Sequence, residues 1–213
     1  MAKTDGKEQG VKLFKAEIKE QIEEFLNEEG INWGDNQQKQ GYFFAVMIAE
    51  KICDTLGGYE LFGEIPESRD GGIDFVLEDT ENKRAIIGQT KLMRITQTKT
   101  KTAERDSIAR HFGLHRTIMD KSIFIDATKS VLVNLEDYEK WINDGWDIEY
   151  VYITTDKNPL PELPKKDKTK RASISYAIWD LYYLKDFFWK SKQLSATPPE
   201  EVTFKLKKDK SFL

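Results

Sequence analysis

Two short apolar segments separated by a polar insert constrain the fold of this chain more than any other feature. The first reads DGGIDFVL at residues 70–77, and the second reads AIIGQTK at residues 85–91. Every residue from 78 to 84 is polar or charged. Apolar, β-branched runs on either side of a short polar stretch are typical of a β-hairpin. The pattern therefore predicts two antiparallel strands within a sheet.

Polar residues interrupt both predicted strands. Asp74 lies within the first strand, and Gln89 and Lys91 stand two apart on the second. Since side chains alternate between the faces of a strand, Gln89 and Lys91 are expected to share one face. Antiparallel pairing can bring Asp74 alongside them. A carboxylate, an amide and an ammonium group on the rim of a sheet could hold a divalent metal and an activated water, as in a phosphodiesterase site.

The Asp, the hairpin and the Gln-x-Lys sequence resemble the signature of the PD-(D/E)xK nuclease superfamily. The residues GGID…QTK look most like the Mrr-type branch, and within it like the N-terminal domain of the abortive-infection phage-resistance (AIPR) proteins. The similarity extends over roughly residues 40–206. It implies a restriction endonuclease-like α/β sandwich with a central mixed β-sheet flanked by helices. It also implies a Mg²⁺-dependent (or Mn²⁺-dependent) endonuclease that hydrolyses DNA in anti-phage defence. Proteins of that group are usually much longer, which leaves room for further domains in a longer parent protein.

The resemblance assigns catalytic roles to Asp74, Gln89, Lys91 and Glu50. Asp74 would be the primary metal ligand. Gln89 would be a second ligand, where the superfamily more often has Glu, and the main-chain carbonyl of Thr90 could add another. Lys91 would orient the attacking water or stabilise the developing charge. Superfamily members also carry an acidic residue on the preceding helix, for which Glu50 is the candidate metal ligand. The alternative is that Glu50 lies on the solvated stripe of that helix.

The charge balance gives no global field that would attract a polyanion, since the net charge is -4 and the pI about 5.4. Binding of nucleic acid needs only a local basic surface. Residues 91–105 begin at the predicted catalytic lysine and are rich in groups that can contact phosphates. A second basic run at residues 165–171 is better explained as a solvated loop. The predicted nucleic-acid-binding residues are Lys91, Arg94, Gln97, Lys99 and Lys101.

The composition is that of a globular protein, with 39% hydrophobic and 33% charged residues in 213. No apolar run is long enough to cross a membrane. A single cysteine excludes an intrachain disulfide and fits a reducing cytoplasm. We expect an N-terminal tail and amphipathic helix over residues 1–36 and a nuclease-like domain over residues 37–213. Superfamily enzymes often form dimers to cut both strands, so this chain could form a homodimer. The aromatic residues at 179–189 could form the dimer contact if they are exposed. Core packing explains these aromatics better.

Periodicity, glycines and prolines give the expected elements. Helices are predicted at residues 11–27, 38–56, 103–119, 135–143 and 181–192. Strands are predicted at residues 59–62, 72–77, 85–91, 147–155, 173–179 and 202–206. Residues 122–126 form either a short strand or a loop.

Two other functions remain open. Arg110 and His115, separated by four residues, match the loose pattern of HEPN ribonucleases, which cleave RNA without metal. Those domains are all-helical, and the predicted strands argue against them. The alternative from another class is a catalytically inactive nuclease-like module that binds nucleic acid or a protein partner. The acidic pI and the neutral Gln89 favour this alternative.

Overall fold

The computed structural model describes residues 2–67, 72–93, 103, 105–119, 135–157, 163, 165–168 and 171–195. The helices are α1 (Ala2–Glu28), α2 (Gln37–Leu56), α3 (Arg105–Met119), α5 (Leu135–Asp144) and α6 (Leu181–Ser195). The strands are β1 (Glu60–Leu61), β2 (Phe75–Asp79), β3 (Arg84–Lys91), β4 (Asp147–Thr154), β5 (Asp167–Lys168) and β6 (Ser173–Trp179).

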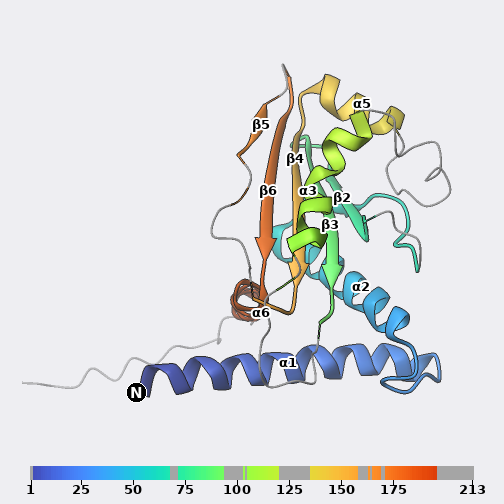
Figure 1. Ribbon diagram of the computed structural model, residues 1–213. Helices are drawn as coiled ribbons and strands as arrows, with labels where there is room; N and C mark the ends of the chain where they lie inside the picture. The colour runs from blue at the N-terminus through green and yellow to red at the C-terminus, as the bar shows by residue number, and fades with distance from the viewer. Residues whose placement is uncertain are drawn as a thin grey trace, which may run out of the picture.

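The strands form one mixed sheet in the order β1-β2-β3-β4-β6-β5 (Figure 1). Strands β1, β2 and β3 are antiparallel neighbours. Strands β3, β4 and β6 run parallel, and β5 is antiparallel to β6. The parallel strands therefore end at the same edge of the sheet. The predicted α/β class with a mixed sheet and flanking helices is confirmed.

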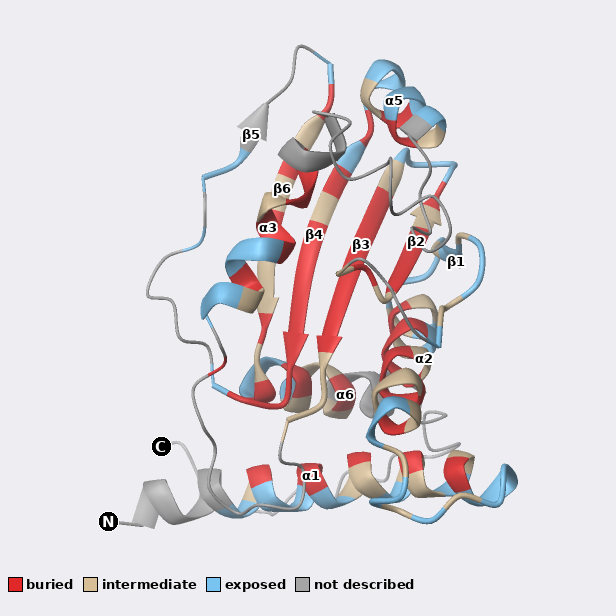
Figure 2. Cartoon of the chain, turned by 45° about the vertical axis from the view of Figure 1, so that its right-hand side comes forward, coloured by how far each residue is buried: buried red, intermediate tan, exposed pale blue. Residues whose placement is uncertain are grey.

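Helices cover both faces of this sheet because successive residues of the central strands are buried on opposite sides. Ile86 of β3 packs in a core with α1, α2 and α6, and we call this side the α2 face. Ile87 packs in a second core with α3 and α5, and we call this side the α3 face. The buried stripe of α1 crosses below the carboxyl ends of β3 and β4 (Figure 2). Burying a side chain of this size contributes about 1.5–3 kcal/mol, so both faces stabilise the sheet.

The predicted hairpin joins β2 to β3 through a turn at residues 80–83. The buried carboxylate of Asp79 accepts hydrogen bonds from the Asn82 amide nitrogen at 2.9 Å and from its side chain at 2.9 Å. Asp79 also forms an ion pair with Arg84. Hydrogen bonds from Arg84 and then from Asn82 lower the pKa of Asp79 to about 2. The polar insert therefore closes the turn that fixes the register of the two motif segments.

Most predicted elements are present, with different ends. The first helix begins at Ala2 instead of residue 11, and the predicted strand at 59–62 is reduced to Glu60–Leu61. The predicted segments at 122–126 and 202–206 lie outside the described residues. Of the described aromatic side chains on α6, only Tyr182 and Tyr183 are exposed. No helix in the described part of the chain is both long enough and apolar enough to span a membrane.

Gly88 gives a prediction about packing between the two motif strands. A Cβ added at Gly88 would lie 2.2 Å from Cζ of Phe75, its partner across the strands. We expect Gly88→Ala to lower the free energy of unfolding by about 2 kcal/mol, because overpacking forces the ring out of its site. Urea denaturation measures the change.

Gly41→Ala on α2 is the matched control for this prediction. A Cβ at Gly41 meets nothing within 4 Å. Because glycine weakens a helix interior, this change should raise the free energy of unfolding by about 0.5 kcal/mol. Equal stability of Gly88→Ala and the wild type would contradict the packing argument.

Candidate functional site

The ladder between β2 and β3 is irregular at Asp74. Phe75 pairs with Gly88 in register, and the Asp74 amide also donates to the Gly88 carbonyl at 2.8 Å. Two successive residues opposite one is the pattern of a β-bulge. Bulges interrupt the ladder and redirect side chains, so strict alternation does not extend to Asp74.

The carboxylate of Asp74 is bound to Thr90, the middle residue of the Gln-Thr-Lys sequence. Its Oδ2 accepts from the Thr90 amide at 2.5 Å and from the Thr90 hydroxyl at 2.8 Å. Thr90 pairs with Ile153, which packs in the core on the α2 face. The Thr90 side chain therefore belongs to the α2 face, and the carboxylate lies against it.

Gln89 and Lys91 point to the α3 face. Gln89 is 6% exposed and pairs with Tyr152, whose ring packs in the core on that face. Its Nε2 lies 3.6 Å from the place that a Cβ would take at Gly72. Lys91 is half-buried at the end of β3 and follows Gln89 by two residues.

The prediction of one common face for Asp74, Gln89 and Lys91 is therefore corrected. The structure brings Gln89 and Lys91 to one face, as predicted, but the Asp74 carboxylate lies beside Thr90 on the other. The physical reason is the bulge, which gives Gly88 two opposing residues. The contacts join Asp74 to Thr90. We call these two residues, together with Lys91 at the carboxyl end of β3, the rim site. Lys91 is the last residue of that strand, and its side chain is half-buried.

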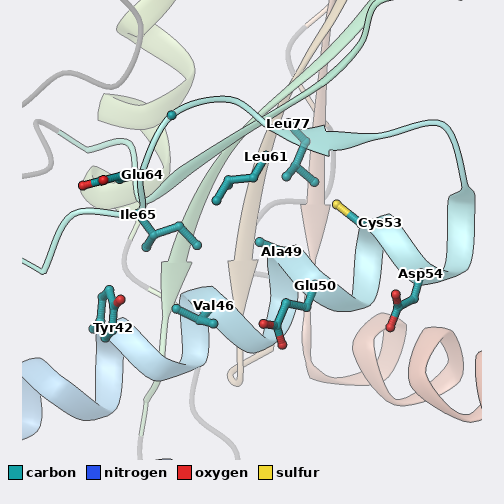
Figure 3. Close-up of a pocket in the computed structure, with 11 residues that line it drawn as sticks. Tyr42, Val46, Ala49, Glu50, Cys53, Asp54, Leu61, Glu64, Ile65 and Leu77 are labelled. Atoms are coloured by element: carbon teal, nitrogen blue, oxygen red, sulfur yellow. The ribbon is translucent and has the colours of Figure 1, made fainter.

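Glu50 does not join the rim site. It is exposed on α2, whose buried residues Ile48, Ala49 and Ile52 face the sheet. Figure 3 shows Glu50 near Asp54 at a pocket of about 460 Å³ between α2 and the strands β1 and β2. The residues lining this pocket do not include Asp74, Gln89 or Lys91. The assignment of Glu50 to the metal set is corrected, since the turn of the helix places it on the solvated stripe.

The rim site offers few ligands for a metal ion. Among the residues that the structure describes, no three His, Cys, Asp or Glu side chains gather as a metal site. The amide and carbonyl of one strand residue point to the same neighbouring strand. Because the Thr90 amide reaches Asp74, its carbonyl points to the β2 side as well. Mg²⁺ commonly takes one or two carboxylates and completes its shell with water and substrate phosphate. Asp74 and the Thr90 carbonyl fit such an ion, whereas the Gln89 amide lies on the other face.

The remaining candidates fall in two groups. The predicted nucleic-acid contacts Arg94, Gln97, Lys99 and Lys101 lie outside the described residues. Arg110 is exposed on α3, whereas His115 is buried with its Nδ1 2.6 Å from the Tyr138 hydroxyl. These two side chains therefore lie on different sides of the helix. The geometry gives the HEPN-like pair no support.

His111 is a residue of this region that the sequence did not single out. It is fully buried on α3, and its Nδ1 lies 3.0 Å from the Gly72 carbonyl oxygen. Burial, and to a lesser degree the charge of Lys91, lower the pKa of His111 to about 4. The spacing of His111 and His115 puts both on one face of a helix, which is the signal that could have found them.

Comparison of the chain with protein-family models, with curated proteins and with solved structures found no match. The function is therefore argued from the residues of the rim site and from their geometry.

Proposed function

We propose that this chain is a Mg²⁺-dependent endonuclease of the PD-(D/E)xK type that hydrolyses phosphodiester bonds in DNA. The contact between Asp74 and Thr90 carries the proposal. It joins the two halves of the sequence motif across 16 residues and places a carboxylate beside the Gln-Thr-Lys segment.

The order of the elements supports the same proposal. Helix α2 precedes three antiparallel strands, and α3 and α5 follow before β4 joins the sheet parallel to β3. This arrangement agrees with the mixed sheet and flanking helices that the resemblance implies. Asp74 immediately precedes β2, and Lys91 is the last residue of β3. Because these two strands are antiparallel, both residues lie at the same edge of the sheet.

The chemistry follows from the groups at that edge. A bound Mg²⁺ would neutralise charge on the scissile phosphate and lower the pKa of a coordinated water. Asp74 and the Thr90 carbonyl would hold the ion. The Thr90 amide and hydroxyl orient the Asp74 carboxylate by donating to its Oδ2. The Lys91 ammonium would stabilise negative charge that develops on the phosphate oxygens.

A cleavage assay with controlled metal content tests the proposal. The purified 213-residue chain is incubated with supercoiled plasmid, linear duplex and RNA, in Mg²⁺, in Mn²⁺ and in EDTA. We expect DNA cleavage with Mg²⁺ or Mn²⁺, none in EDTA, and recovery when Mg²⁺ is returned in excess. Because the described residues supply one carboxylate to the rim site, half-maximal activity should require Mg²⁺ near the millimolar range. Cleavage that persists in EDTA would overturn the proposal.

A second function is favoured by one specific observation. The only carboxylate at the rim site among the described residues already accepts two hydrogen bonds through Oδ2, and the residue expected to supply a second charge is the neutral, buried Gln89. These features suit a nuclease-like module that binds nucleic acid or a protein partner without cleaving. The same assay separates the two functions, because the module would retard DNA in a gel at every metal concentration and leave it intact.

The role in anti-phage defence rests on the resemblance alone. Expression of the wild-type chain and of Asp74→Asn in a phage-sensitive bacterial host tests it. Protection from plaque formation by the wild type alone would support a defence role that uses nuclease activity.

A further inference from the structure

The sheet has an open edge at β1. Among the described strands, β1 stands first in the sheet order and pairs with β2 only. The Phe62 amide donates to the Val76 carbonyl at 2.9 Å, so the main chain of Phe62 faces β2. Because main-chain groups alternate in direction along an antiparallel strand, the amide and carbonyl of Leu61 point away from β2. An open edge of this kind can accept a further strand.

An apolar pocket lies beside this edge on the α2 face. Its volume is about 460 Å³, and Val46, Leu61 and Ile65 point into it in Figure 3. Leu61 pairs with Leu77 of the core on the α2 face but remains 45% exposed. We call this the edge pocket. Apolar side chains that entered it from an added strand would be stabilised by burial.

The charged groups around the edge are acidic on both faces of the sheet. The charged side chains that line the edge pocket are Glu50, Asp54 and Glu64. On the α3 face, Glu60 of β1 lies opposite Glu78 of β2, since successive residues of a strand alternate between faces. Burial, and next the charge of Asp54, raise the pKa of the Cys53 thiol in the pocket. A strand that fits this edge therefore has one apolar face and carries positive charge.

Residues 202–208 of the same chain have this pattern. They read VTFKLKK and lie outside the described residues. Apolar and polar residues alternate in the order Val202, Thr203, Phe204, Lys205, Leu206 and Lys207. This period of two is typical of a strand with one apolar face. With that face toward α2, Lys205 and Lys207 would lie on the same face of the sheet as Glu60.

The chain between α6 and this segment is long enough to reach the edge pocket. Phe188 of α6 and Asp54 line a second cavity, and Asp54 also lines the edge pocket. Helix α6 continues from Phe188 to Ser195, a length of about 10 Å. From Ser195 to Val202, an extended chain spans up to about 24 Å. The connection therefore reaches the pocket whichever way α6 points.

We propose that residues 202–208 add to β1 as a strand and place their apolar side chains in the edge pocket. The added main chain bonds to the amide and carbonyl of Leu61, and its lysines lie near the acidic side chains of the edge. This contact covers Leu61 and closes an edge that other chains could otherwise pair with. The inference does not depend on the proposed nuclease function, because the residues lining the pocket do not include Asp74 or Lys91.

Disulfide trapping gives the first test. Cys53 is the only cysteine of the chain and lines the edge pocket. A cysteine is introduced at one position at a time from 202 to 207, and the 213-residue chain is oxidised with diamide at low protein concentration. A disulfide needs Cα atoms within about 7 Å and converging Cβ atoms. We expect the fastest bond to Cys53 at position 202, 204 or 206, and rates at least about tenfold lower at 203, 205 and 207.

The product also identifies the occupant of the pocket. A cross-linked monomer with alternating rates supports the inference. Disulfide-linked dimers whose yield rises with protein concentration would assign the pocket to a second copy and overturn it. Equal rates at all six positions, or no disulfide at any of them, would also overturn it.

Reversal of one charge gives the second test. Glu60→Lys places a cation opposite the lysines of the segment, and Glu20→Lys makes the same change at an exposed position of α1. Each trapping rate is divided by the rate at which Cys53 reacts with a small disulfide reagent, which corrects for changes in the thiol. We expect trapping to slow about fivefold in Glu60→Lys and to stay within about twofold in Glu20→Lys. Equal rates in the two variants would overturn the inference, because the acidic edge is what selects a basic segment.

Discussion

Replacing Asp74 with asparagine should lower Mg²⁺-dependent DNA cleavage about a thousandfold and leave the fold intact. Asparagine has nearly the shape of aspartate, and its side-chain oxygen can still accept from the Thr90 amide and hydroxyl. What the change removes is the negative charge that would hold the metal ion. A metal ion stabilises the transition state of phosphate hydrolysis by several kcal/mol. Loss of about 4 kcal/mol corresponds to about a thousandfold in rate. Single-turnover cleavage at saturating Mg²⁺ measures the effect.

Glu50→Gln is the matched control for Asp74→Asn. Both changes turn a carboxylate into an amide on the same protein, but Glu50 is exposed at the pocket on the α2 face and away from the rim site. Cleavage by Glu50→Gln should stay within about twofold of the wild type. If Asp74→Asn cleaves as fast as Glu50→Gln, Asp74 does not hold the catalytic metal. Unfolding in urea shows whether either change acts through stability, and we expect a difference below about 1 kcal/mol.

The hairpin and the sheet could be predicted from the sequence because they depend on local patterns. The apolar run on each side of residues 78–84 and the polar turn give β2, β3 and their antiparallel pairing. The spacing of Gln89 and Lys91 correctly gives a shared face, since both belong to one regular strand. The helices follow from apolar periodicity, which indicates that a helix is present but does not fix its ends. The predicted helices therefore differ from the observed ones mainly at their ends.

The face of Asp74 could not be predicted, because it depends on how two strands meet. A bulge depends on how two strands pair, and here Asp74 and Phe75 both lie opposite Gly88. The glycine that permits this approach is visible in the sequence, but its partner is not. The predicted role of Glu50 is wrong for a related reason. On α2, Ala49 faces the sheet and the next residue, Glu50, faces solvent. His111 was missed because its burial comes from the packing of α3 against the sheet.

His111 should make the stability of this protein depend strongly on pH between about 6.5 and 4. The pKa of His111 is lowered from 6.5 to about 4, first by burial and to a lesser extent by the charge of Lys91. In this range the unfolded chain binds a proton at this residue and the folded chain does not. Stability therefore falls as the pH falls, because protons favour the state that binds more of them. A difference of this size corresponds to about 3 kcal/mol of unfolding free energy lost across the window.

Urea denaturation of the wild type and of His111→Gln, at intervals from pH 7 to pH 4, measures this contribution. Other groups titrate in both proteins, so their effect cancels in the difference between the two curves. The pKa of Asp79 is lowered in the folded protein, so its contribution to stability declines only below its usual pKa of 3.8. That range lies outside the window. We expect the wild-type curve to fall more steeply by about 3 kcal/mol and the two curves to be parallel above pH 7. Parallel curves over the whole range would mean that His111 takes up its proton in the folded state near pH 6.5.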